Sequence, residues 1–158
     1  MTGSRVGKHT FPGADAASGH VIDQTVVEAF ARDGVVCVRG ALDPDEVALA
    51  AEAIEAVLAQ PGALAQVASG ADDPGRFFED FCRWTEVDAI GRLARDSRVP
   101  AIAAALLATP QVRLYHDHVL VKEGGTAQRT PWHQDQPYYN VDGRGVSAWI
   151  PVDPVPEA

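Results

Sequence analysis

The chain changes character at Thr109-Pro110, and this change most constrains what it can fold into. Before it, apolar residues recur at helical spacing, whereas the runs after it are rich in β-branched and aromatic residues and predict strands. Helices gathered first and strands afterwards indicate an α+β arrangement, in which helices buttress a sheet or barrel. The 158 residues suffice for one domain.

The helical part should contain four helices, and the second is the best defined. Asp43 supplies an N-cap, Pro44 stands at the first helical position, and the acid Glu46 follows three residues after the cap. Helices are expected at about 24–33, 44–58, 87–95 and 100–107. Strands are expected at 35–38, 112–121, 132–139 and 146–152, with a loop at 61–75. Core packing is expected of an aromatic cluster comprising Phe77, Phe78, Phe81 and Trp84.

The ends and the composition exclude several classes of protein. Residues 1–23 predict a flexible tail with neither signal peptide nor membrane span, because glycines and Pro12 interrupt any apolar run. The net charge of −9 disfavours nucleic acid and anionic lipid as partners. Cys37 and Cys82 lie far apart without metal-binding spacing, which favours a cytoplasmic location.

The chemistry is concentrated in residues 130–139, which read TPWHQDQPYY. In an extended segment residues i and i+2 project from one face, so His133 and Asp135 could bind one metal ion together. Such a pair is two thirds of the 2-His-1-carboxylate triad of non-haem Fe(II) enzymes. The third ligand must come from elsewhere, and no histidine follows His133 in this sequence.

Four short motifs in order give the sequence a resemblance to a known family. They are DGVV with RG at 33–40, YHDHVLVKE at 115–123, PWHQD with PYY at 131–139, and AWIPVD at 148–153. Together they resemble the phytanoyl-CoA dioxygenase family of Fe(II)- and 2-oxoglutarate-dependent oxygenases. The resemblance implies a double-stranded β-helix (a cupin-like jelly-roll barrel) over residues 24–158, with helices at about 24–108 packed outside strands at about 111–158.

The same resemblance implies a role for individual residues. His133 and Asp135 would be the catalytic iron ligands, with Fe(II), 2-oxoglutarate and O2 as the cofactor and co-substrates. Trp149 would lie against bound 2-oxoglutarate, with Thr130 and His118 as further candidates for that pocket. The implied activity is hydroxylation of a small organic substrate.

Two further tyrosines, Tyr138 and Tyr139, would face the substrate opening. Family members also carry a distal histidine that completes the triad, and an arginine about ten residues further on that pairs with 2-oxoglutarate. Neither has a counterpart in this sequence. We therefore expect a C-terminally truncated member with an incomplete barrel.

Two alternative hypotheses remain open at this point. The chain could be a non-catalytic half-barrel remnant or binding module. It could also be a cupin-type metal protein that uses His116 and His118, which share one strand face, with Glu123 five residues on. The glycines that the cupin motif expects are not in register.

Overall fold

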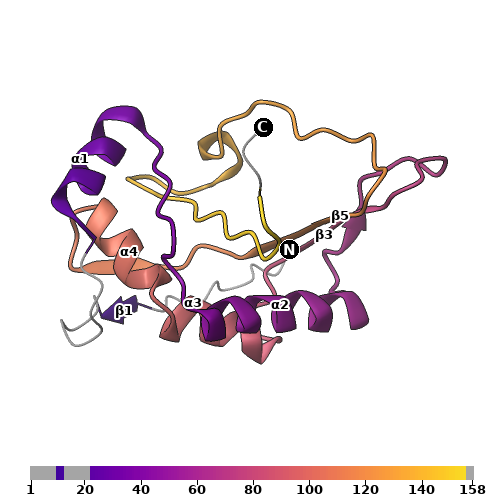
Figure 1. The fold of residues 1–158 in the computed structure, drawn as a ribbon, viewed down its shortest axis with the longest axis horizontal. Helices are drawn as coiled ribbons and strands as arrows, with labels where there is room; N and C mark the ends of the chain where they lie inside the picture. Colours follow the sequence, from indigo (N-terminus) through magenta and orange to yellow (C-terminus); the bar gives the residue numbers. More distant parts are fainter. Residues whose placement is uncertain (1–9, 13–21, 156–158) are drawn as a thin grey trace.

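Four helices and two small antiparallel sheets make up the part of the chain that the computed structural model describes, residues 10–12 and 22–155 (Figure 1). The helices are α1 (Gln24–Asp33), α2 (Pro44–Ala59), α3 (Asp88–Asp96) and α4 (Val99–Leu106), and a 3-10 turn, η1, spans Gln136–Tyr138. The larger sheet contains β2 (Gln66–Val67), β3 (Phe77–Phe81) and β5 (His118–Lys122), and the smaller one pairs β1 (Thr10–Pro12) with β4 (Gln111–Arg113). The expected α+β class and four helices are confirmed.

The core lies between the larger sheet and two helices. Strand β3 is central, with β2 on one side and β5 on the other, and Phe78 is paired with Val121 across the β3–β5 ladder. Side chains from α2, β3 and α3 meet in one buried cluster, which comprises Ala53, Val57, Phe78, Ala89 and Ile90. In Figure 1, α2 and α3 lie below the sheet, and the chain after β5 runs above it in orange and yellow. The helices thus cover one face of the sheet.

Helix α2 begins as its sequence predicts. The Asp43 carboxylate accepts a hydrogen bond from Glu46 N at 3.0 Å, and the Glu46 carboxylate accepts one from Asp43 N at 2.8 Å. The same two carboxylates bind Arg98 at the start of α4, through its backbone N–H and its guanidinium. The capping box therefore also ties α2 to α4.

A buried ion pair fixes the end of β3. Asp80 is fully buried, and its Oδ2 atom accepts hydrogen bonds from Arg83 Nη1 at 2.5 Å and from Gly62 N at 2.8 Å. Burial raises the pKa of the Asp80 carboxyl, but these bonds and one from Phe81 N outweigh it and hold the pKa below its ordinary value of 3.8. The chain after α2 is thereby attached to β3.

The strand expected at 112–121 is divided in two. Residues 114–117, between β4 and β5, belong to neither sheet. Here the Asp117 carboxylate accepts hydrogen bonds from the backbone N–H groups of Arg83 and Trp84, at 3.0 and 2.9 Å. Cys82 precedes these two residues with a positive φ of 61°. The side chain of Asp117 caps the turn after β3, which the β-rich sequence pattern did not reveal.

Three other predicted strands are wrong, and so is the prediction that the last third of the chain is built of β-strands. Residues 35–38 are irregular and Val35 is 73% exposed, while 132–139 and 146–152 form no strand. In or beside the last two segments, Pro131, Pro137 and Pro151 lack the backbone N–H that a β-ladder needs. No described strand pairs with any of the three segments. The described residues form an open three-stranded sheet, not a barrel, so the jelly-roll is not seen in them.

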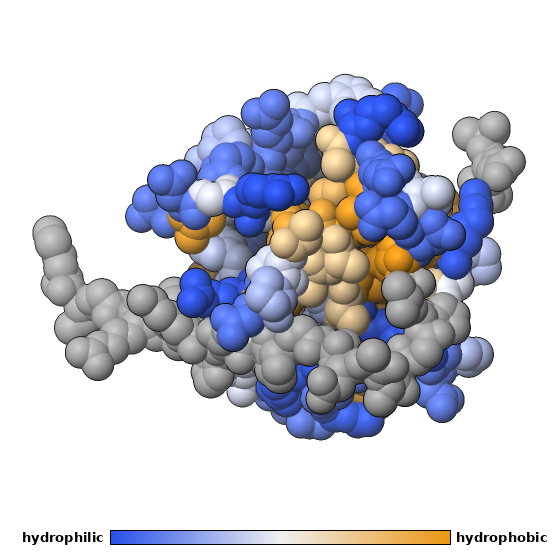
Figure 2. Space-filling model, turned by 90° about the vertical axis from the view of Figure 1, so that its left-hand side faces the viewer, coloured by the Kyte–Doolittle hydropathy of each residue, from blue (hydrophilic) through white to orange (hydrophobic). Residues whose placement is uncertain are grey.

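The predicted loop at 61–75 is confirmed apart from the two residues of β2, and Phe77 and Phe78 are buried as expected. Most of the tail predicted at residues 1–23, namely 1–9 and 13–21, lies outside the described residues. Its described part contains the strand β1, which was not predicted. No helix in the described residues is long and apolar enough to span a membrane. Figure 2 shows an apolar area between hydrophilic side chains on the side of α1 and α4.

Candidate functional site

The two residues of the predicted metal pair face each other. Nε2 of His133 lies 3.3 Å from Oδ1 of Asp135, and both side chains are about 40% exposed, at 40% and 41%. Two ligand atoms at about 2.1 Å from a metal and at right angles lie about 3 Å apart. The pair therefore has the separation that two adjacent ligands of one ion require.

Hydrogen bonds leave the metal-facing atoms of the pair available. Nδ1 of His133 lies 2.8 Å from Pro131 O, which can only accept, so Nδ1 carries the proton and Nε2 holds the lone pair in the neutral ring. Oδ2 of Asp135 accepts a hydrogen bond of 2.6 Å from Ser147 Oγ, which leaves Oδ1 to face His133 and a metal ion. Metal-binding histidines and carboxylates usually have such outer partners. The donor set thus fits a divalent metal.

A tight turn follows the pair and positions the two tyrosines. Tyr138 N donates to Asp135 O at 2.9 Å, which closes η1 and places the Tyr138 ring edge-on to the His133 ring, with centroids 6.2 Å apart. Tyr138 is 75% exposed and borders the pair at His133. Its predicted place at a substrate opening stays a prediction.

Tyr139 points the other way, toward the chain before β5. Its ring lies 4.9 Å from that of Tyr115 and 5.2 Å from that of His116. Burial raises the pKa of Tyr139 above its ordinary value of 10.0, the charge of Asp135 raises it further, and a hydrogen bond with Ser147 opposes the rise. A protonated Tyr139 hydroxyl therefore lies beside Ser147, which itself bonds Asp135.

His118 begins β5 and lies on the sheet face opposite the buried cluster. Its ring stacks on Phe81, with centroids 3.9 Å apart, and its Nε2 atom lies 3.3 Å from Oε1 of Glu79. Desolvation lowers the pKa of His118 below 6.5, and the carboxylate of Glu79 opposes this shift. A role for His118 in binding 2-oxoglutarate stays a prediction.

Thr130 and Trp149, the other two predicted pocket residues, have different surroundings. Thr130 Oγ1 accepts a hydrogen bond of 3.0 Å from Lys122 Nζ, and that ammonium also lies 4.4 Å from the centroid of the Phe77 ring. Trp149 is 75% exposed, two residues after Ser147. The structure thus provides a cation beside Thr130 and leaves Trp149 facing solvent.

No group of three His, Cys, Asp or Glu side chains in the described residues could hold a metal ion. The pair is therefore two ligands without a third in that part of the chain. The cupin-type hypothesis gains no support, because the Glu123 carboxylate bonds the backbone N–H and the guanidinium of Arg76. His116 instead packs against Tyr115 and Tyr139.

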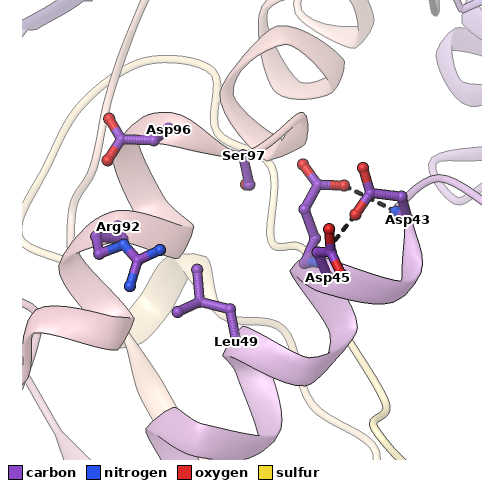
Figure 3. Close-up of a pocket in the computed structure, with 7 residues that line it drawn as sticks. Asp43, Asp45, Leu49, Arg92, Asp96 and Ser97 are labelled. Atoms are coloured by element: carbon purple, nitrogen blue, oxygen red, sulfur yellow. Dashed lines mark hydrogen bonds between the residues drawn. The ribbon is translucent and has the colours of Figure 1, made fainter.

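The pocket drawn in Figure 3 has a volume of about 300 Å³ and lies between α2 and α3. Its walls are mostly acidic and contain none of the predicted site residues; they comprise Asp43, Asp45, Glu46, Leu49, Arg92, Asp96 and Ser97. Asp43 and Glu46 are already bonded within the capping box and to Arg98. We assign these two carboxylates a structural role.

Two groups that hold the pair, Ser147 and the carbonyl of Pro131, were not predicted from the sequence. Ser147 lies 12 residues after Asp135, too far along a helix or a strand for the two side chains to touch. A backbone carbonyl has no sequence signal at all. Only the path of the chain between them brings these groups together.

One family model, described as phytanoyl-CoA dioxygenase (PhyH), matches residues 30–158. The match covers more than half of the chain and includes the His133–Asp135 pair. The chain belongs to the phytanoyl-CoA dioxygenase family, and this membership points to an oxygenase. No curated protein and no solved structure gives a significant match.

Proposed function

We propose that this chain supplies two iron ligands, His133 and Asp135, of an Fe(II)- and 2-oxoglutarate-dependent oxygenase that hydroxylates a small organic substrate. The observation that carries the proposal is the 3.3 Å separation of His133 Nε2 and Asp135 Oδ1, within a match to an oxygenase family. When bound, iron and 2-oxoglutarate supply the O2-activating chemistry of such enzymes. A reducing, cytoplasmic location stays a prediction.

The residues of the chain would bind the metal ion and orient the two ligand side chains. Pro131 O keeps the proton of His133 on Nδ1, so that Nε2 can donate its lone pair to the metal. Ser147 bonds one oxygen of Asp135 and leaves the other for the metal. The ammonium of Lys122 donates a hydrogen bond to Thr130 Oγ1, three residues before His133. This cation could attract an anionic co-substrate.

The test is anaerobic addition of Fe(II) and 2-oxoglutarate to the chain. Chelation of Fe(II) by 2-oxoglutarate in a protein site gives a visible charge-transfer band, and we expect this band with the unaltered chain and not with Asp135→Ala. Its absence from the unaltered chain at saturating concentrations would overturn the proposal. Asn140→Ala, an exposed change in the same segment, is the matched control and should keep the band.

Admission of O2 then separates the oxygenase from the non-catalytic binding module. An oxygenase should convert 2-oxoglutarate to succinate only when Fe(II) is present. A band that persists without succinate would favour the binding module instead.

A further inference from the structure

We propose that Ser147 is a positioning residue that determines which oxygen of Asp135 faces the metal. The inference rests on the proposed function, because it concerns the same His133–Asp135 pair. It assigns a role to a serine that the sequence analysis did not single out.

The direction of the hydrogen bond follows from the chemistry of its two partners. Ser147 has one hydroxyl hydrogen, and Oδ2 of the Asp135 carboxylate can only accept, so the serine donates across the 2.6 Å contact. The bond therefore has one polarity, from Ser147 to Asp135.

This polarity selects one oxygen of Asp135. Oδ2 is occupied by the serine, and Oδ1 is the atom that lies 3.3 Å from His133 Nε2. The last torsion of an aspartate side chain is broad and two-fold, so an unrestrained carboxylate can present either oxygen or both. Ser147 removes this ambiguity.

Titration of the full chain with Mn(II) alone, followed by electron paramagnetic resonance of the free ion, tests the inference. Ser147→Ala should raise the dissociation constant about tenfold, at the low end of what outer partners of metal ligands contribute. Ser147→Thr, which keeps the hydroxyl, should stay within about twofold of the unaltered chain.

Asn140→Ala is the control, because it changes an exposed residue of the same segment, and it should leave the constant unchanged. Unchanged affinity in Ser147→Ala, or equal weakening by Ser147→Ala and Ser147→Thr, would overturn the inference. Asp135→Ala keeps the two proposals distinguishable. If it loses binding while Ser147→Ala does not, the proposed function survives and the inference fails; if it binds like the unaltered chain, both fail.

Discussion

Nε2 of His133 and Oδ1 of Asp135 lie 3.3 Å apart on a segment without strand structure, so their convergence depends on hydrogen bonds and a turn. Pro131 O holds the imidazole, Ser147 holds the carboxylate, and η1 begins directly after Asp135. These contacts orient both donor atoms. Stability elsewhere in the chain depends on a few buried or capping polar groups, which can be tested separately.

Replacement of Asp80 by Asn should destabilise the fold strongly. Asp80 is fully buried against Arg83, which is itself only 7% exposed, and removal of the carboxylate leaves a buried guanidinium short of a partner. Loss of one partner of a buried pair costs about 3 kcal/mol or more. Urea unfolding followed by circular dichroism measures the free energy of unfolding.

Asp33→Asn is the control, because Asp33 forms an exposed ion pair with Arg32 and should cost less than about 1 kcal/mol. The contribution of Asp80 to the free energy of unfolding should also depend on pH. Its pKa in the folded chain is lowered below 3.8, so its stabilisation is complete above pH 3.8 and is lost as the pH falls through the folded value. Equal destabilisation by the two variants at neutral pH would contradict the assignment.

Asp43→Ala should destabilise the chain by about 1–2 kcal/mol, the usual cost of removing a helix N-cap. The carboxylate accepts the bond from Glu46 N and also pairs with Arg98 at 2.9 Å, so both α2 and α4 lose a contact. Thermal unfolding measures the loss. Asp45→Ala in the same helical turn removes an acid that is not the cap, and an equally large loss there would refute the capping role.

The pKa of His118 should be below 6.5 and should fall further in Glu79→Gln. Desolvation lowers the pKa, whereas the neighbouring carboxylate favours the protonated ring and limits the shift. Nuclear magnetic resonance titration of the His118 ring protons measures both values. A higher midpoint in Glu79→Gln would show that the two side chains do not interact as the 3.3 Å contact indicates.

This shift has a consequence for stability. Because the unfolded chain binds a proton at His118 more readily than the folded chain does, the free energy of unfolding should rise with pH from the folded pKa up to about pH 6.5. His118→Gln should therefore lose less stability than the unaltered chain on acidification below that pH. His116→Gln is the comparison, and a larger loss in His118→Gln would reverse the predicted sign.

Local signals in the sequence predicted the helices well. Asp43 and Glu46 act within one turn of each other, and Gly34 ends α1 with a positive φ of 76°, so each boundary depends on residues close in sequence. The strands were predicted less well because a strand needs a partner. Val35 is β-branched but has no ladder in the described residues, whereas Phe78 pairs with Val121 and is buried.

The candidate site was predicted in part for a similar reason. The two-residue spacing of His133 and Asp135 is visible in the sequence, and their side chains do converge, although not through the strand from which the spacing was argued. Ser147 could not be predicted, because its contact with Asp135 depends on how the intervening chain returns. Short-range spacing identified the pair, and tertiary structure provided its support.

Anaerobic titration of the full chain with Fe(II) tests the central claim most directly, with His133→Ala and Asp135→Ala measured beside it. The account predicts saturable binding of one ion by the unaltered chain and loss of that binding in both variants. His116→Ala serves as the control and should bind as the unaltered chain does. Unchanged Fe(II) binding in His133→Ala or Asp135→Ala would contradict the claim that these two side chains hold the metal.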